Sequence, residues 1–320
     1  MFIPSAWPRI SWVHKPFIPV VALLPYVFLY ASVVTKSFIT RKNHAAELDR
    51  YPHDGIIFHS GQRCRTCHLL KPARSKHCSF CNACVSRHDH HCVWLMNCVG
   101  RDNYVYFLSL LLSLSVMLTY GSYLGYGVLC QTRDLLLPSG SHLRLIQQDW
   151  TTFFNIWFVV LAADARVGVV FMLAFMTAPL AMAFLVYHTY LIWAGMTTNE
   201  SGKWSELKED VADGYVFRST RREIYGTTST DSFSGSWPGN SEQILILTDG
   251  DPPTEGDLEL LLSNNNVQNG QNGQNGQNGH ADGPVDRRWT RVRSMKEVDN
   301  IYDLGFWDNL RDAVKLRVRR

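Results

Sequence analysis

Three long stretches without a charged side chain set the strongest limit on how this chain can fold. They cover Phe17–Thr35, Tyr104–Cys130 and Val167–Asn199. A helix needs about 20 apolar residues to cross the hydrocarbon core of a bilayer, and each stretch is close to or above that length. Buried helices of a large soluble core rarely stay uncharged for so long. We therefore expect three membrane-spanning helices.

Two details refine this expectation. The first stretch is not a secretory signal, because Pro19 and Pro25 interrupt it and no small-residue cleavage site follows. In the second stretch, Gly121, Gly125 and Gly127 are spaced so that another helix can approach closely.

Composition excludes several classes of protein. Hydrophobic residues make up 46% of the 320 residues and charged residues only 18%. These fractions argue against a wholly soluble enzyme, a collagen-like fibre and a largely disordered chain. A net charge of +3 is too mild for a dedicated nucleic-acid-binding protein.

Charges beside the spans predict the orientation. Three spans put residues 36–103 and 200–320 on the same side of the membrane, and an excess of lysine and arginine near the spans favours the cytosol for that side. The cationic residues near the spans are Lys36, Arg41, Lys42, Arg101, Lys203 and Lys208. The opposite loop, 131–166, carries three arginines. Its apolar run Phe153–Ala163 is too short to span, so we expect an interfacial helix there.

Cysteines are concentrated in the first polar segment. Seven of the eight cysteines lie between Cys64 and Cys98. Because cytosolic thiols stay reduced, metal binding explains this density better than disulfides do. Two short pairs, Cys64 with Cys67 and Cys78 with Cys81, have the spacing that presents two thiolates to one tetrahedral zinc.

The segment contains more possible ligands than two zinc sites need. His77, His90 and His91 lie in the same stretch. Six cysteines and two of these histidines would fill two four-coordinate zinc sites, so one cysteine and one histidine stay unassigned. A closed structural site does no chemistry. A Cys and a His close together beside an Asp are the parts of an activated thiol nucleophile.

The spacing of these residues resembles that of a known family. The pattern is Cys64-x2-Cys67-x9-His77-Cys78-x2-Cys81-x2-Cys84-x4-Asp89-His90-His91-Cys92-x5-Cys98-x4-Asn103-x3-Phe107. It is similar, position by position, to the cysteine-rich domain of the DHHC protein S-acyltransferases. Thr197-Thr198-Asn199-Glu200 matches that family's TTxE motif, and Asn300–Gly305 resembles its C-terminal element. Lys71–Cys78 and Tyr302–Asn309 are further similar to the fungal spore-wall-formation branch, whose members acylate SNARE proteins.

The resemblance implies two interleaved structural zinc sites. The first would be held by Cys64, Cys67, His77 and Cys84, and the second by Cys78, Cys81, His91 and Cys98. Metal binding would supply folding energy to a segment with few aliphatic residues.

The resemblance also implies an acyl-transfer reaction. Cys92 would attack the thioester of palmitoyl-CoA, and the acyl-enzyme would pass its palmitoyl group to a cysteine of a membrane protein, a SNARE in the fungal branch. His90 would serve as the base, and Asp89 would orient it. The supporting positions are Thr198, which would touch Asp89, Asn300 and Tyr302.

The acyl donor would bind near the membrane surface. Lys71, Arg74 and Lys76 form a basic cluster. We consider two interpretations, contact with the phosphates of acyl-CoA and a strip facing anionic lipid. Cys92 precedes the second span closely, so its sulfur can lie at the interface while the acyl chain lies among the helices.

The sequence thus predicts an α-helical polytopic membrane protein with a cytosolic zinc-stabilised cysteine-rich domain of short β-hairpins and loops. We infer the endoplasmic reticulum membrane from the fungal resemblance. The expected segments are a lumenal N-terminal segment (1–16), a span (17–35), the zinc domain (36–103), a span (104–130), a lumenal loop (131–166), a span (167–196), a cytosolic segment with the TTxE motif (197–226), a disordered insertion (227–286) with a short helix near Leu258–Leu262, and a C-terminal amphipathic segment (287–320) that would dock on the zinc domain or the membrane.

Two departures from the family pattern stand out. Family members usually have two spans before the zinc domain, and one is found here. Met1–Trp12 resembles the end of a loop, so we expect either that the natural chain begins upstream or that a first helix has been lost. Val93 replaces the usual proline after the Cys of the motif.

Three functions remain in competition. An acyltransferase predicts that Cys92 can be replaced by Ser without loss of zinc, whereas replacing Cys98 releases metal. If the protein is a non-catalytic, membrane-tethered zinc-binding interaction module, every cysteine should either bind metal or have no chemical role. An inactive member of the family would keep zinc and structure but form no acyl-enzyme.

Overall fold

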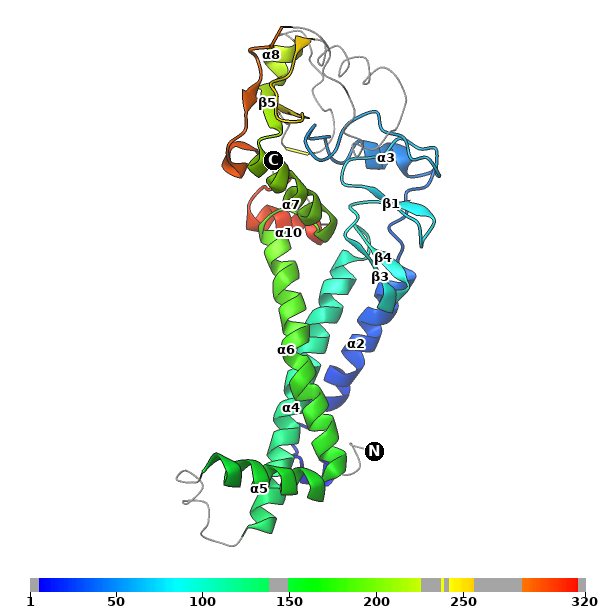
Figure 1. Ribbon diagram of the computed structural model, residues 1–320. Coiled ribbons are helices and arrows are strands. Elements are labelled where there is room, and N and C mark those ends of the chain that lie inside the picture. The colour runs from blue at the N-terminus through cyan, green and yellow to red at the C-terminus, as the bar shows by residue number, and fades with distance from the viewer. Residues whose placement is uncertain (1–5, 138–148, 226–236, 239–241, 256–283, 316–320) are drawn as a thin grey trace. The chain divides into compact units, whose positions relative to one another are not determined.

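The computed structural model describes residues 6–137, 149–225, 237–238, 242–255 and 284–315. Within these residues, three helices are long and apolar enough to cross a membrane: α2 (Phe17–Val34), α4 (Tyr104–Leu136) and α6 (Ala165–Trp193) (Figure 1). They lie in the three uncharged stretches of the sequence. The expected helical fold with several candidate spans is confirmed.

The chain divides into two compact units. The first consists of Met1–Ser32 and Tyr106–Thr189, and the second of Val33–Val105 and Tyr190–Arg320. Each is described by itself.

The first unit is built from apolar helices. Besides the greater part of the three long helices, it contains the 3-10 turn η1 (Trp7–Arg9) and α5 (Trp150–Ala163). Its buried core consists of Ala6, Ile10, Leu124, Val128, Leu129, Val160 and Val167. The Arg9 guanidinium pairs with Asp164 at 2.5 Å and thereby ties the turn η1 to the link between α5 and α6.

One of the three glycines of α4 allows a close helix approach. A Cβ at Gly125 would lie 3.1 Å from the Cβ of Phe171 on α6, which is tighter than ordinary van der Waals contact. At Gly121 and Gly127 a Cβ would meet no heavy atom within 4 Å among the described residues. Within this unit, the predicted close approach of another helix is therefore seen at Gly125 and not at Gly121 or Gly127.

The second unit begins with two short β-hairpins. β1 (Lys76–Cys78) pairs antiparallel with β2 (Ala83–Val85), and β3 (His90–Cys92) pairs with β4 (Asn97–Val99). The 3-10 turn η2 (Val93–Leu95) connects β3 to β4, and α3 (His44–Leu48) precedes both hairpins. This is the cysteine-rich domain of short strands and loops that the sequence predicted.

The rest of the second unit packs a helix against a small sheet. The helix is α7 (Thr198–Asp213), and the sheet has the strand order β6-β5-β7, with β5 (Val216–Thr220), β6 (Gln243–Leu247) and β7 (Thr290–Arg291). The helix α8 (Arg221–Tyr225) follows β5, and the 3-10 turn η4 (Met295–Glu297) follows β7. The core between them consists of Ile56, Leu207, Val211, Val216, Leu245, Val292 and Val298.

The strand β6 corrects the predicted bounds of the disordered insertion. It lies inside 227–286, yet it pairs with the whole of β5 and buries Leu245. The reason is its run of four aliphatic residues, 244–247, which can cover an apolar face that polar neighbours cannot. The Gln-Asn-Gly repeats and the expected helix near Leu258–Leu262 lie outside the described residues.

The chain's last described helix is α10 (Phe306–Ala313). It is amphipathic, as the sequence suggested for this segment. Asn309 and Ala313 are buried in the second unit, so α10 is docked within the unit that contains the cysteine-rich hairpins. The terminal basic residues after Lys315 lie outside the described residues.

Candidate active site

The first group of possible metal ligands is assembled by the β1–β2 hairpin. His77 and Cys84 face each other across the two strands. Cys64 and Cys67 approach from the preceding turn, where the backbone N–H of Cys67 points at the Cys64 sulfur. The Nδ1 of His77 lies 3.5 Å from the sulfur of Cys64, 3.4 Å from that of Cys67 and 3.8 Å from that of Cys84.

The second group repeats this plan on the β3–β4 hairpin. His91 faces Cys98 across the strands, and Cys78 and Cys81 approach from the end of β1 and the turn that follows it. The Nδ1 of His91 lies 3.6, 3.5 and 3.6 Å from the sulfurs of Cys78, Cys81 and Cys98, respectively. Because Cys78 directly follows His77, the two groups interleave along the chain.

These distances fit tetrahedral zinc. With Zn–S bonds of about 2.3 Å and Zn–N bonds of about 2.0–2.1 Å, adjacent sulfur and nitrogen ligands lie about 3.5–3.6 Å apart. Five of the six nitrogen–sulfur distances are within 0.1 Å of that range, and the sixth is 3.8 Å. All eight cysteines are described and none forms a disulfide. The two sets of four residues could each hold one metal ion, and they are the two sets that the resemblance implied.

Strand geometry separates the zinc histidine from the catalytic candidates. Successive side chains of a strand point to opposite faces. His91 therefore faces its cysteines, while His90 and Cys92, two residues apart, share the other face of β3. The imidazole of His90 forms a hydrogen bond with the Cys92 thiol. On its other side, His90 Nδ1 lies 2.6 Å from the Oδ2 of Asp89.

The contacts of His90 and Cys92 shift both pKa values in the direction that favours an ion pair. Burial alone would lower the pKa of His90, but the hydrogen bonds to Asp89 and Cys92 outweigh it and raise the pKa to about 9. Burial alone would raise the pKa of Cys92. The hydrogen bond from His90, with backbone N–H groups of the following turn, outweighs burial and lowers this pKa below the ordinary value. Thiolate is the nucleophilic form of cysteine.

The N-terminus of α7 holds Asp89 in place. The Thr198 backbone N–H donates to Asp89 Oδ1 at 2.9 Å, and its hydroxyl donates to Oδ2 at 2.8 Å. Thr197 and Glu200 form a capping box, in which each side chain accepts the other's backbone N–H. The Thr197 hydroxyl also donates to the His88 carbonyl at 3.0 Å. The motif thus starts a helix and fixes the carboxylate of Asp89.

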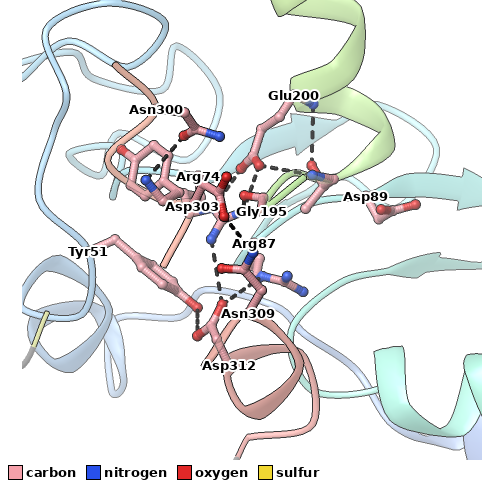
Figure 2. Close-up of polar contacts among 12 residues, drawn as sticks. Tyr51, Arg74, Arg87, Asp89, Gly195, Glu200, Asn300, Asp303, Asn309 and Asp312 are labelled. Atoms are coloured by element: carbon pink, nitrogen blue, oxygen red, sulfur yellow. Dashed lines mark hydrogen bonds and ion pairs between the residues drawn. The ribbon is translucent and has the colours of Figure 1, made fainter. Parts of the chain in front are cut away.

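A buried arginine connects this helix start to the cysteine-rich segment. Arg74 donates to both carboxylate oxygens of Glu200, at 2.7 and 2.6 Å, and to the Gly195 carbonyl at 3.1 Å (Figure 2). Both partners of this ion pair have only 1% of their side chains exposed. The rings of Tyr51 and Tyr302 lie over the guanidinium, with centroids 5.2 and 4.7 Å from its carbon.

Comparison with known proteins identifies the family. The model of the DHHC palmitoyltransferase family matches residues 57–205. Palmitoyltransferase swf1 of Aspergillus fumigatus is 63% identical over 324 residues, which cover 100% of this chain and 83% of that protein. The chain belongs to the DHHC palmitoyltransferase family. Palmitoyltransferase swf1 of Emericella nidulans is 60% identical, covering 97% of this chain and 74% of that protein. Palmitoyltransferase SWF1 of Neurospora crassa is 38% identical, with coverages of 98% and 71%. The resemblance to the fungal branch is confirmed, and the chain is a DHHC protein S-acyltransferase.

The C-terminal element of this DHHC enzyme packs beneath the end of α6. The Asn300 side chain donates to the Ala194 carbonyl at 3.2 Å, and the Asn309 side chain donates to the Trp193 carbonyl at 3.3 Å. These bonds satisfy carbonyls that the end of a helix leaves without intrahelical partners. The Tyr302 hydroxyl donates to the Pro52 carbonyl at 2.7 Å. Asn300 and Tyr302 are thus packing positions, and both lie on the segment that contacts Arg74.

The expected phosphate contact of Arg74 does not fit the structure. Its guanidinium is buried and binds Glu200, so it is not at a surface that a phosphate can reach. The sequence alone misplaced it because its counter-ion lies 126 residues away. Lys76 is exposed and donates to Asn199 at 2.9 Å, while Lys71 is half-buried, so these two lysines keep the accessibility that a phosphate needs.

Nothing in the sequence indicated that three further residues belong to this site. Tyr51, Arg87 and Asp312 converge beside Arg74, with the Tyr51 hydroxyl 2.7 Å from Asp312 and the Arg87 guanidinium 3.2 Å from it (Figure 2). None of them belongs to a motif with a recognisable spacing. By contrast, the Thr-x-x-Glu pattern at Thr197 is a general signature of a helix N-terminus, and it could have located the start of α7.

Proposed function

We propose that this enzyme moves a palmitoyl group from palmitoyl-CoA to cysteines of membrane proteins through an acyl-enzyme on Cys92. The observation that carries the proposal is the Cys92 thiol. It is the one thiol of the cysteine-rich segment 64–98 outside the two sets of possible zinc ligands, and it is hydrogen-bonded to an imidazole that a buried carboxylate holds. This arrangement has the parts of an activated cysteine nucleophile.

In the first step, His90 accepts the proton of the Cys92 thiol. The thiolate then attacks the thioester carbonyl of palmitoyl-CoA, the bond from the carbonyl carbon to the CoA sulfur breaks, and CoA leaves with the proton that His90 returns. In the second step, His90 accepts the proton of the substrate thiol. That thiolate attacks the acyl-enzyme, and Cys92 is released as the thiol. Asp89 keeps the imidazole oriented throughout both steps.

The two metal sites take no part in these steps. Each set of three cysteines and one histidine would complete the coordination of a structural zinc ion, which supplies folding energy and leaves no position for a substrate. Because His91 is a ligand and its neighbours His90 and Cys92 are not, the second zinc site would fix the strand on which the nucleophile lies.

We assign the phosphates of the acyl donor to Lys71 and Lys76. Lys203 of α7 lies near enough to both lysines that their charges help to lower its pKa, after the larger effect of its burial. A cluster of cations at the start of α7 suits a phosphate group. A surface facing anionic lipid is the competing interpretation, and it predicts that replacing the lysines weakens membrane binding without changing the KM for palmitoyl-CoA.

We further propose SNAREs with cysteines next to a membrane span as substrates, with the catalytic unit in the cytosol at the endoplasmic reticulum. The multi-span character of the chain and its place in the DHHC family support membrane-embedded substrates. The lysines and arginines beside the spans support the orientation. The similarity to the fungal branch supports the substrate class and the organelle.

Covalent labelling tests the acyl-enzyme. The detergent-purified protein and its Cys92→Ser variant are incubated with labelled palmitoyl-CoA and then treated with hydroxylamine, which cleaves thioesters. We expect a hydroxylamine-labile label on the wild type and none on the variant, with equal zinc in both. Absence of label on a folded, zinc-loaded wild type would reject the proposal and leave the non-catalytic zinc-binding module. A substrate peptide with a cysteine beside an apolar segment then tests the transfer step.

A further inference from the structure

The last described helix, α10, places one carboxylate in the network beside the proposed catalytic residues. Asp312 lies on α10, and its side chain is 11% exposed. Its Oδ1 accepts the Tyr51 hydroxyl at 2.7 Å. Its Oδ2 lies 3.2 Å from Arg87 Nε and 3.5 Å from Arg74 Nη1 (Figure 2). Three side chains from the segment before the catalytic strand therefore share this one carboxylate.

The two arginines need this carboxylate because they are buried. Their side chains are only 1% and 4% exposed, for Arg74 and Arg87 respectively. A buried cation without a counter-charge is strongly destabilising. Arg74 already has Glu200, whereas the ion pair of Arg87 is with Asp312. Burial and the nearby Asp312 raise the pKa of Tyr51 well above its ordinary value, so its hydroxyl stays protonated and donates to Asp312.

Both arginines also have an unfavourable backbone conformation. Arg74 has a φ of 61° and Arg87 a φ of 42°, in the left-handed region that non-glycine residues rarely adopt. Such a conformation persists where the surroundings hold it in place. The side chains that would hold it converge on Asp312.

Arg87 lies in the turn that leads into β3, the strand of His90 and Cys92; this is the Arg87 turn. It lies between β2 and β3, two residues before Asp89. The backbone N–H of His88 donates to the Arg74 carbonyl at 2.9 Å, so the residue after Arg87 is bonded to the other left-handed residue at this turn. The next backbone N–H, that of Asp89, donates to the Val99 carbonyl of β4 at 2.9 Å. A shift of the turn would therefore move Asp89 relative to Thr198 and His90.

We propose that Asp312 is a positioning residue for acyl transfer, which holds the Arg87 turn so that Asp89 and His90 stay aligned with Cys92. Asp312 would act through its contacts with Tyr51, Arg74 and Arg87 and not on the reacting atoms. The inference rests on the proposed function, because alignment matters only if Cys92 is the acylated residue. It makes the C-terminal helix part of the catalytic machinery, although 223 positions separate Asp312 from Asp89 in the sequence.

The test compares variants of the full-length protein in detergent. Asp312→Asn keeps the shape of the side chain and removes its charge. Asp312→Glu restores the charge. Asp308→Asn is the matched control, because Asp308 lies on the same helix in a partly exposed pair with Arg311. The measured quantities are the maximum rate of acyl-enzyme formation, the KM for palmitoyl-CoA, bound zinc, and the rate at which iodoacetamide alkylates Cys92.

We expect Asp312→Asn to lower the maximum rate of acyl-enzyme formation about tenfold. This is a fraction of the roughly 10²- to 10⁴-fold rate increase that general acid–base catalysis provides. The KM and the bound zinc should stay as in the wild type, and the alkylation of Cys92 should slow in parallel. Asp312→Glu should recover part of the rate, and Asp308→Asn should match the wild type. Alkylation needs no acyl donor, so it reports alignment even if acyl-enzyme formation, and with it the proposed function, fails in the wild type.

A wild-type rate in folded Asp312→Asn would overturn the proposal. A rate that falls only in proportion to lost zinc would do the same, because Asp312 would then be merely structural. If Asp312→Asn does not retain zinc, the double variant Arg87→Met/Asp312→Asn decides, since it removes both buried charges together. A folded double variant that alkylates slowly supports the proposal, and one with the wild-type rate rejects it.

Discussion

Thr198 and Asp89 are joined by two hydrogen bonds, one to each carboxylate oxygen. The Thr198 backbone N–H reaches Oδ1 at 2.9 Å, and its hydroxyl reaches Oδ2 at 2.8 Å. The same Oδ2 lies 2.6 Å from His90 Nδ1. The carboxylate therefore has a fixed orientation, and Nδ1 of His90 is occupied, which leaves Nε2 for Cys92. A helix start more than 100 residues downstream thus holds the carboxylate that orients the proposed catalytic base.

Thr198→Val should slow acylation by removing one of these two bonds. The variant keeps the backbone N–H and the branched shape but loses the hydroxyl. A hydrogen bond to a charged group is worth about 1.5–3 kcal/mol, so we expect the rate of acyl-enzyme formation to fall about 10- to 100-fold. The measurement is the rate of hydroxylamine-labile labelling. Thr189→Val, at an exposed threonine of α6, is the control and should acylate normally. Equal rates in the two variants would contradict the assigned role of Thr198.

The pH dependence of Cys92 alkylation should differ from that of an ordinary cysteine. A free thiol has a pKa near 8.5, so its alkylation rate rises steeply between about pH 7 and 8.5. The hydrogen bond and charge of His90 lower the pKa of Cys92 despite burial, and His90 stays protonated up to about pH 9. The thiolate fraction of Cys92 at neutral pH should therefore be larger than that of a free thiol.

We expect the alkylation rate of the wild type to rise less steeply over this range than that of a free thiol, because the lowered pKa of Cys92 shifts the rise to lower pH. His90→Gln removes the cation, so the steep rise toward high pH should return. Iodoacetamide labelling of a Cys130→Ser background measures both profiles, because the zinc ligands are protected. A wild-type profile as steep as that of a free thiol would argue against the ion pair.

Parts of this site could be predicted from the sequence because their residues are close along the chain. The zinc sets and the group Asp89, His90 and Cys92 lie within 35 residues. Counting ligands left open which cysteine and histidine stay outside the metal sets, and the family resemblance made that assignment. Strand alternation explains why His91 faces a set of three cysteines while His90 shares the other face of β3 with Cys92. The contact of Thr198 with Asp89 came from the motif and not from spacing, since no local rule connects residues so far apart.

The rest could not be predicted, because burial depends on distant partners. Arg74 looked like a surface cation in a basic cluster, and only Glu200 and the rings of Tyr51 and Tyr302 make it a core residue. Asp312 lies 238 residues from Arg74. The strand β6 was hidden for a similar reason, since its partner β5 precedes an insertion whose composition is polar.

Replacing individual cysteines should separate the nucleophile from the zinc ligands. Cys98→Ser exchanges a thiolate ligand for a poor one, so we expect loss of one zinc ion and of the β3–β4 hairpin. Binding of a structural zinc contributes about 10–16 kcal/mol in zinc-finger peptides, far more than a small domain can lose. Cys92→Ser should retain both ions, because Cys92 belongs to neither set.

Zinc is measured by elemental analysis of the purified variants, and unfolding by circular dichroism. Cys130→Ser, outside the cysteine-rich segment, is the control and should keep zinc and activity. Loss of zinc from Cys92→Ser would make Cys92 a ligand and remove the nucleophile from the proposed mechanism.

Arg74 should contribute to stability more than any exposed arginine of the same unit. Its guanidinium and Glu200 are both about 1% exposed, and Glu200 belongs to the capping box of α7. Breaking a buried pair by removing one partner costs about 3–5 kcal/mol, because the other charge is left without compensation. Arg74→Met should therefore lower the free energy of unfolding by about that amount. The start of α7 should loosen, and acylation should slow through Thr198.

Arg74→Lys distinguishes charge from geometry. An ammonium group keeps the charge but cannot make the two parallel bonds to Glu200 together with the bond to Gly195, so the lysine variant should recover only part of the stability. Arg41→Met, at an exposed arginine of the same unit, should change the free energy of unfolding by less than about 0.5 kcal/mol. Denaturant unfolding of the zinc-loaded proteins measures the free energies of unfolding that rank these variants. If Arg74→Met were as stable as Arg41→Met, the ion pair would not hold the TTxE helix, and the link from Arg74 to Asp89 would have to be abandoned.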